Sequence, residues 1–289
     1  MKREIAAGQL AFPEGPVVLG SGRVAVCEQF ASRISVFDGG RMEVWCETGG
    51  SPNGAALGGD GCLYVAQNGG VVGNWRAELP LTPCIQRVWP DGSCETLCEA
   101  VGADRLFAPN DLCFGPDGRL YFTDPAHGYN PSARGEDGRI YALSPQGRSA
   151  DVLIIRLAPV YCNGIGFTAD RRLVWVESYD CRVCTLEEGH DRLLCTLPAG
   201  HVPDGFAIAA DGRLFIATLF SAGITVIGPD GEYLEHIPLE EDSCPTNCAF
   251  EGNVLWVTDA GDFGHEQRGG RLWRLDTDAT GLPLHVGSL

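Results

Sequence analysis

A short motif recurs six times along the chain: Pro or Cys, then a polar residue and a small one, leading into an apolar stretch, a turn and a second apolar strand. The polar residues assigned to this motif are Glu14, Asn53, Asn110, Asn163, Asp204 and Asn247. They stand 39 to 57 positions apart, which is the spacing of the blades of a β-propeller. The repeat therefore predicts an all-β fold, a six-bladed β-propeller, with residues 1–289 forming one domain.

The strand pattern within each repeat agrees with this fold. Asp60-Gly61, Asp117-Gly118 and Asp211-Gly212 are hairpin signals, because these pairs tolerate the positive φ of tight turns. The strands that follow, such as LYFT and LFIA, are almost continuously apolar, as expected for strands buried on both faces. Six weaker strands lie between the repeats and would form the outer halves of the blades. We expect residues 1–10 to add an edge strand to the last blade and close the ring, since an open ring would leave sheet edges exposed.

Composition limits the classes of partner and the cellular location. The formal net charge of −17 repels phosphate backbones, so we expect no nucleic-acid partner. No apolar run approaches the roughly 18 residues that a membrane-spanning helix needs, so we expect no membrane association. The first 14 residues lack the apolar core of a secretory signal. The 13 cysteines are then expected to be reduced, buried thiols of a cytoplasmic protein.

The common phase of the polar residues predicts a metal site. Residues at one place in every inner strand lie at one height on the wall of the central channel, where carboxylates and amides would face each other with few cations nearby. Such groups are costly if left unpaired, and a divalent cation would compensate them. The candidate ligands are oxygen donors: Glu14, Asp204, Asn110 and Asn163. This donor set suits Ca²⁺, Mg²⁺ or Mn²⁺, while Zn²⁺ and Fe²⁺ stay open.

Several motifs also carry a family resemblance: F-P-E-G-P, P-N-D-L-x-F-x-P-D-G-R-L-Y-F-T-D-P, C-N-G-I-G-F and P-D-G-F-A. In this order and spacing, the chain resembles the family of gluconolactonase, regucalcin (senescence marker protein) and luciferin-regenerating enzyme. The resemblance covers nearly the whole chain and implies a six-bladed propeller with a catalytic divalent metal. It implies Glu14, Asn163 and Asp204 as ligands, Asn110 as a fourth, and Asp204 also as the acid/base residue.

The chain departs from that family at one position. Sugar lactonases of the regucalcin type place an Arg two residues before the residue equivalent to Asn110, where it touches substrate hydroxyls. Here that position is Ala108, followed by Pro109. The bacterial-type T-D-P after the next strand is present as Thr123-Asp124-Pro125. This departure leaves the substrate open but does not affect the metal ligands.

The expected activity is hydrolysis of a small lactone, with a sugar-derived lactone as the leading candidate. Asp204 would take a proton from the attacking water, and Asn110 and Asn163 would donate amide hydrogens to the developing oxyanion. Asn53, His201, His127 and Tyr129 are candidate substrate contacts, the last two on the long polar loop 125–138. A second long loop, 68–83, is also expected to lie over the binding site.

Three alternatives stay open at this point. The same metal site could serve a phosphotriester hydrolase, with Asp204 as nucleophile or base, or a lactone isomerase or cyclase. The chain could also be a binding propeller with a structural metal, in which case protein oxygens would close the coordination sphere. The expected partner is a small-molecule substrate, and the oligomeric state is open.

Overall fold

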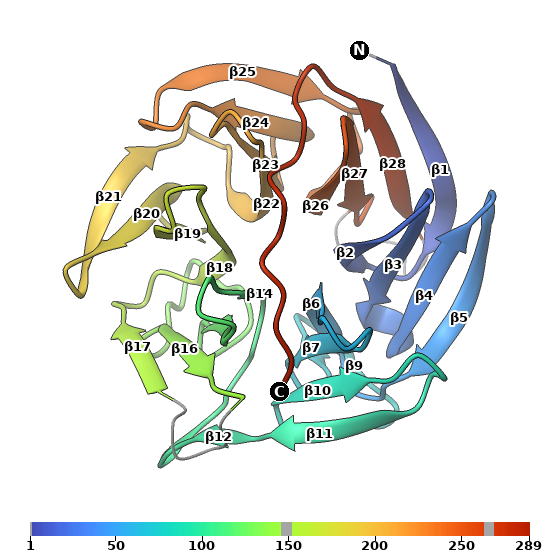
Figure 1. Cartoon of the computed structure of the whole chain (residues 1–289), viewed down its shortest axis with the longest axis vertical. Coiled ribbons are helices and arrows are strands. Elements are labelled where there is room, and N and C mark those ends of the chain that lie inside the picture. Colours follow the sequence, from blue (N-terminus) through green and yellow to red (C-terminus); the bar gives the residue numbers. More distant parts are fainter. Residues whose placement is uncertain (1, 146–151, 263–268) are drawn as a thin grey trace.

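The computed structural model describes residues 2–145, 152–262 and 269–289. Six four-stranded antiparallel sheets radiate from a central channel, as the repeat predicted (Figure 1). We number the blades 1 to 6 in the order of their inner strands. Blades 1 to 3 contain β2 (Pro13–Gly20), β3 (Arg23–Glu28), β4 (Arg33–Asp38), β5 (Arg41–Glu47), β6 (Pro52–Leu57), β7 (Leu63–Gln67), β10 (Cys84–Val88), β11 (Cys94–Cys98), β14 (Leu112–Phe114), β15 (Leu120–Asp124), β16 (Arg139–Leu143) and β17 (Val152–Arg156).

The second half of the ring repeats this arrangement. Blades 4 to 6 contain β18 (Cys162–Phe167), β19 (Leu173–Glu177), β20 (Arg182–Glu187), β21 (His190–Thr196), β22 (Pro203–Ile208), β23 (Leu214–Thr218), β24 (Gly223–Ile227), β25 (Tyr233–Pro238), β26 (Pro245–Glu251), β27 (Val254–Asp259), β28 (Gly270–Asp276) and β1 (Arg3–Leu10). Two short hairpins add β8 (Val71–Val72) with β9 (Trp75–Arg76), and β12 (Ala100–Val101) with β13 (Asp104–Arg105). No helix in the described residues is long and apolar enough to span a membrane.

The N-terminal strand closes the ring. β1 pairs antiparallel with β28, from Arg3 opposite Leu275 to Leu10 opposite Gly270, and so becomes the outermost strand of blade 6. The prediction that the first ten residues supply this strand is confirmed for residues 3–10. The last blade is therefore built from both ends of the fold, and blade 1 packs against a complete sheet instead of an open edge.

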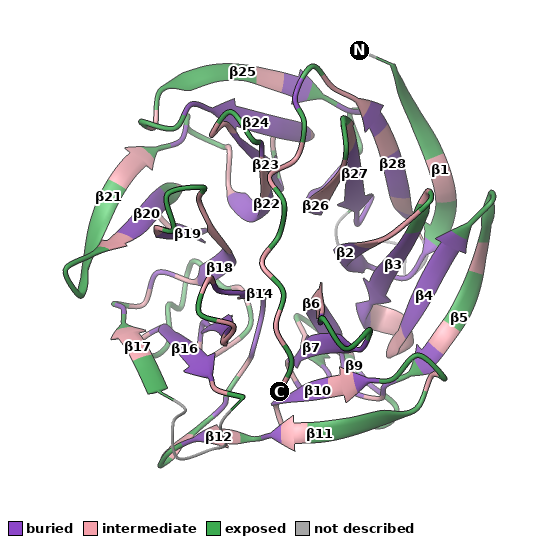
Figure 2. Cartoon of the chain, viewed as in Figure 1, coloured by how far each residue is buried: buried purple, intermediate pink, exposed green. Residues whose placement is uncertain are grey.

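Burial is highest in the second strands of the blades and lowest in the outermost strands. The second strands β7, β15 and β23 are buried at every residue, which explains why their sequences lack alternation (Figure 2). The outer strands β5, β11 and β21 expose most of their residues. Apolar clusters fill the spaces between neighbouring blades, so each blade is held by side-chain packing on both faces.

The inner strands converge so closely that glycine is required beside the channel. A Cβ atom on Gly205 would lie 1.9 Å from Cγ of Asn247, and one on Gly164 would lie 2.6 Å from the carbonyl oxygen of Asp204. Both contacts are shorter than any Cβ atom tolerates. The motif has a small residue at this position because adjacent blades approach each other too closely there for a Cβ atom.

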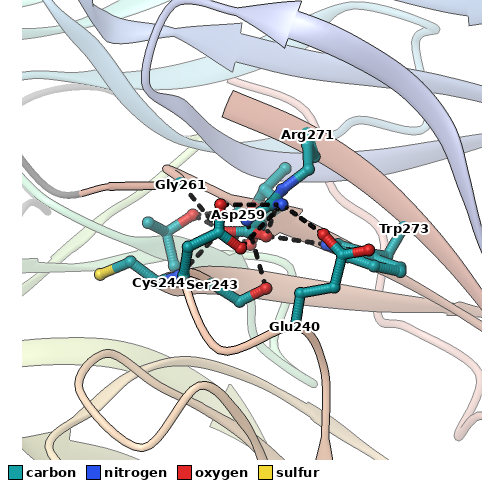
Figure 3. Close-up of polar contacts among 10 residues, drawn as sticks. Glu240, Ser243, Cys244, Asp259, Gly261, Arg271 and Trp273 are labelled. Atoms are coloured by element: carbon teal, nitrogen blue, oxygen red, sulfur yellow. Dashed lines mark hydrogen bonds and ion pairs between the residues drawn. The ribbon is translucent and has the colours of Figure 1, made fainter. Parts of the chain in front are cut away.

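Buried acids at the ends of second strands hold the turns that lead into the inner strands. In blade 6, the Asp259 carboxylate accepts hydrogen bonds from the backbone N–H groups of Cys244 and Gly261 at 2.8 Å (Figure 3). It also accepts from Nε of Arg271 at 2.9 Å and Nε1 of Trp273 at 2.8 Å. In blade 3, Asp124 likewise accepts from the N–H groups preceding Pro109.

Residues 277–289 cross one end of the channel from blade 6 toward blade 2 (Figure 1). The N–H of Leu282 donates to the carbonyl of Ile208 at 2.8 Å, and the N–H of Gly59 donates to the carbonyl of Gly287 at 2.8 Å. Beneath this segment lies a largely apolar cavity of about 450 Å³, with Asp111 and Asn247 among its lining residues. The repeat pattern did not predict this crossing.

Candidate metal centre and active site

Five of the six predicted polar residues share one phase at the start of the inner strands. Glu14, Asn53, Asn110, Asn163 and Asp204 are all buried, with 3 to 7% of their surfaces exposed. In blades 1, 2, 4 and 5 the preceding Pro or Cys pairs with the last residue of the second strand. In blade 3, the N–H of Asn110 donates to the carbonyl of Thr123 at 2.9 Å. We call these five residues the polar ring.

The sixth residue, Asn247, was assigned the wrong phase. Pro245 pairs with Asp259, the last residue of β27, so Thr246 occupies the position equivalent to Glu14. Asn247 stands one residue further along, where blades 1, 2, 4 and 5 have glycine. Sequence spacing favoured the asparagine because Thr246 is also a small polar residue, and only the strand register separates the two. The Thr246 hydroxyl is used within the fold, donating to the Pro13 carbonyl at 2.7 Å.

Asp111 is a channel residue that the sequence analysis missed. It takes the glycine position of blade 3, opposite Asn247 in blade 6, and Nδ2 of Asn247 donates to its Oδ2 at 3.3 Å. The backbone N–H groups of Leu112 and Cys248 donate to the Asp111 and Asn247 side chains at 2.8 Å. The two side chains thus span the channel beside the polar ring. The signal was available in the sequence, since blade 3 reads P-N-D where blade 2 reads P-N-G.

The acids in the channel are strongly perturbed. Burial, followed by the charges of Asp204 and Asp111, raises the pKa of Glu14 well above its usual range. Burial and the charge of Asp111 do the same to the pKa of Asp204, against a hydrogen bond from Asn163 that lowers it. Burial raises the pKa of Asp111 to about 6. None of the groups that shift these three pKa values is a cation, so ionising the three acids would leave their negative charge uncompensated.

The Asn163 and Asn110 amides of the ring differ in their hydrogen bonds. The Ser178 hydroxyl donates to the Pro203 carbonyl at 2.7 Å, so its oxygen accepts from Nδ2 of Asn163 at 3.2 Å. The Asn163 group that bonds to Ser178 is therefore Nδ2 and not Oδ1. Oδ1 of Asn110 is buried and has no hydrogen-bond partner in the described part of the chain. Buried acceptors of this kind are rare unless a ligand or ion satisfies them.

This donor set fits a hard divalent cation. Two carboxylates, from Glu14 and Asp204, balance a 2+ charge, and the Asn110 and Asn163 oxygens add neutral ligands. Within residues 2–145, 152–262 and 269–289 no group of three or more His, Cys, Asp or Glu side chains is arranged to hold a metal ion by itself. A zinc site of the His and Cys type is therefore absent from those residues, and the candidate centre rests on mixed carboxylate and amide oxygens.

The predicted substrate contacts fall into two groups. Tyr129 lies 5.3 Å, between ring centroids, from both Tyr161 and Tyr179, and the His127 ring lies 6.3 Å from that of Tyr179. Tyr129 thus places part of loop 125–138 against Tyr161, which stands two residues before Asn163 of the polar ring.

His201 contacts the outer half of blade 5. Its Nδ1 is 2.7 Å from Oγ1 of Thr225, and its ring packs 4.8 Å from that of His236. Burial, and then His236, lower the pKa of His201. None of these contacts joins it to the polar ring, so its role as a substrate contact stays a prediction.

Fold and site together define a β-propeller with a centre of carboxylate and amide oxygens at one end of its channel. The family model described as SMP-30/Gluconolactonase/LRE-like region matches residues 12–261. The chain belongs to this family.

Individual relatives agree with that assignment. The chain is 26% identical to a gluconolactonase of Zymomonas mobilis over 71% of its own length and 60% of the relative's. It is 27% identical to the pentonolactonase XacC of Haloferax volcanii, over 60% of the chain and 64% of that protein. The matches thus span less than two thirds of either relative. A structure of regucalcin from Agrobacterium tumefaciens, described as a calcium-binding protein, superimposes with a TM-score of 0.76 at 16% identity, covering 99% of this chain and 97% of the other.

Proposed function

We propose that this protein is a metal-dependent hydrolase that opens the ester of a small lactone, with Glu14, Asn110, Asn163 and Asp204 holding the cation. The observation that carries the proposal is the buried polar ring itself. Two carboxylates lie there without a cationic partner among the groups that shift their pKa values, beside an Asn110 oxygen that no group in the described residues satisfies. A divalent ion resolves both deficits at once.

The relatives support the same chemistry. Both curated relatives are lactonases, one for gluconolactone and one for pentonolactones. The regucalcin neighbour is described as calcium-binding, which agrees with a site made only of oxygen donors. Ca²⁺, Mg²⁺ and Mn²⁺ are therefore the first ions to test, followed by Zn²⁺ and Fe²⁺.

Each ring residue then has a distinct task. A bound divalent ion would supply Lewis acidity that polarises the lactone carbonyl. Asp204, a buried carboxylate beside the Asn163 amide, takes a proton from the attacking water and returns it to the alkoxide leaving group. The Asn163 amide is oriented by its hydrogen bond to Ser178, which itself donates to the Pro203 carbonyl. The Asn110 amide hydrogens stabilise negative charge on the former carbonyl oxygen.

A turnover screen tests the proposal. Protein reconstituted with each ion is assayed against sugar lactones, unsubstituted aliphatic lactones, an aryl-fused lactone and a phosphotriester, with a chelated sample as control. We expect lactone hydrolysis that depends on the ion. Turnover of the phosphotriester alone would assign the centre to phosphoryl chemistry, and full lactonase activity after chelation would exclude the proposed role of the ion.

A further inference from the structure

Two aromatic residues beside the polar ring have a strained backbone. Phe12 has φ of 55° and Tyr161 has φ of 54°, in the left-handed region that bulky L-residues rarely adopt. Each stands two residues before a ring residue, Phe12 before Glu14 and Tyr161 before Asn163. The corresponding residues of the other four blades, Ser51, Ala108, Val202 and Cys244, have no such φ. Blade geometry therefore does not require this conformation, and strain kept at a candidate site points to a role there.

Each strained residue begins a three-ring cluster. On blade 1, the Phe12 ring lies 4.8 Å from Phe30, and Phe30 stacks at 5.0 Å on Trp75, which belongs to the long loop 68–83. We call this the phenylalanine wall.

On blade 4, Tyr161 lies 5.4 Å from Tyr179, and both lie 5.3 Å from Tyr129 of loop 125–138. We call this the tyrosine wall. Blades 1 and 4 are three blades apart in a ring of six, so the two walls stand on opposite sides of the channel. Each wall combines a residue from the base of an inner strand with one from a long loop.

The surroundings of the phenylalanine wall are largely apolar. Phe12 and Phe30 cluster with Val202, Leu219, Cys244 and Ala260, which come from blades 5 and 6. Tyr161 stands two residues before Asn163, so the tyrosine wall begins beside the polar ring. Blade 3 contributes Ala108, which has no group to bind a hydroxyl.

We propose that the two walls clamp a flat, apolar body of the substrate, so that the protein acts on aryl-fused or alkyl-substituted lactones in preference to polyhydroxylated sugar lactones. This inference rests on the proposed lactone hydrolysis and specifies its substrate class. Aromatic faces gain from removing apolar surface from water and from stacking on planar groups. Sugar hydroxyls that pack against the phenylalanine wall would lose their hydrogen bonds to water, and the rings of this wall would offer no hydrogen bonds in return.

The kinetic test compares kcat/KM for three lactones on the metal-loaded protein: dihydrocoumarin, δ-valerolactone and glucono-δ-lactone. We expect dihydrocoumarin to exceed glucono-δ-lactone by at least about tenfold. Trp75→Leu and Tyr129→Leu should each lower kcat/KM for dihydrocoumarin by roughly tenfold and lower it less for δ-valerolactone, which has no aryl group to stack on the walls.

Matched variants separate stacking from hydrogen bonding. Trp75→Phe and Tyr129→Phe keep an aromatic face and should keep most of the preference. Trp89→Leu is a control, because Trp89 lies over Arg87 between β10 and β11, outside both walls. If Tyr129→Phe lost activity only on glucono-δ-lactone, the tyrosine wall would be a sugar site and the inference would be overturned.

Binding without turnover gives a second readout. The lactam analogue of dihydrocoumarin, 3,4-dihydro-2(1H)-quinolinone, should quench tryptophan fluorescence in the wild type, and the part due to Trp75 should disappear in Trp75→Phe. Hydrolysis of glucono-δ-lactone as efficient as that of dihydrocoumarin, with no lactam binding, would overturn the clamp and leave lactone hydrolysis intact. Lactam binding with no lactone hydrolysed would support the clamp and overturn the hydrolase.

Discussion

The chemistry proposed for this protein depends on which atoms of a few buried side chains face the channel. Burial raises the pKa of both Glu14 and Asp204, but different hydrogen bonds oppose this rise. The Asn163 amide lowers the pKa of Asp204, whereas the Gly15 N–H and the Asn247 side chain lower that of Glu14. Two carboxylates of equal charge can therefore have different roles. Replacing each acid by its amide, in Asp204→Asn and Glu14→Gln, can separate these roles.

Asp204→Asn should lose turnover by about 10²–10⁴-fold even at saturating metal, because asparagine keeps an oxygen ligand but cannot accept the proton. Glu14→Gln should mainly weaken metal binding and recover most of its rate when metal is added. Steady-state kinetics across a metal titration would measure both. If excess metal rescued the two variants equally, Asp204 would be a ligand only and the base would lie elsewhere.

Ser178 should act through Asn163. Removing the hydroxyl in Ser178→Ala frees the Asn163 amide to rotate, so metal affinity should fall by about 10-fold, as is usual when an outer partner of a ligand is lost. Isothermal titration with the metal would measure the change directly. Ser243→Ala, which removes another buried serine hydroxyl in the loop before β26, should leave the affinity unchanged; an equal loss in both variants would show a general loss of stability instead.

At the scale of elements, the inner strands have a geometry that depends on their neighbours. Four of them use glycine where adjacent blades approach most closely, while blades 3 and 6 place Asp111 and Asn247 there. A Cβ on Gly54 would lie 2.4 Å from Oδ1 of Asp111, and one on Gly205 would overlap Asn247. The larger residues fit because the adjacent blade has a glycine.

Gly205→Ala should therefore destabilise the protein by about 1–3 kcal/mol through overpacking. Denaturant unfolding would measure the loss. The double variant Gly205→Ala with Asn247→Gly places the larger side chain on blade 5 and the glycine on blade 6. It should recover a large part of the lost free energy of unfolding, because the effects of substitutions at residues in contact are not additive.

Gly8→Ala is the control for that experiment, because nothing lies within 4 Å of a Cβ there and its φ is not positive. It should change the free energy of unfolding by less than about 0.5 kcal/mol. Similar losses in Gly8→Ala and Gly205→Ala would mean that the close approach of blades 5 and 6 does not limit stability.

At the scale of the whole molecule, the ring collects residues that are far apart in the chain around a single channel. Glu14 and Asp204 belong to blades 1 and 5, and each blade is held mainly by packing on its neighbours. A cation bound to several inner strands at once would link blades that share no hydrogen-bonded strands. Metal binding should therefore stabilise the complete fold.

The melting temperature should rise with the concentration of the bound divalent ion. At a free metal concentration 100 times the Kd, the expected gain is about 2.7 kcal/mol for a single site. Differential scanning calorimetry across a metal titration measures this, and the double variant Glu14→Gln with Asp204→Asn should show a much smaller rise. A melting temperature independent of metal in the wild type would contradict the proposed site.

Much of this protein could be read from its sequence, because a propeller blade is a local structure. Each blade forms from consecutive hairpins, so turn signals and apolar strands predict six blades, and their common phase predicts the buried positions of Glu14, Asn53, Asn110, Asn163 and Asp204. The closing strand could also be predicted, since residues 1–10 were left over once six repeats were assigned, and the structure forms the strand from residues 3–10.

Only the tertiary structure decided how separate blades meet. The register of β26 moved Asn247 out of the ring, and the contact between Asp111 and Asn247 joins residues 136 positions apart in the sequence. The opposed aromatic walls and the crossing of residues 277–289 likewise join distant segments. Such contacts arise from packing distances between blades, which no local periodicity encodes, whereas hairpin pairing and burial repeat with every blade.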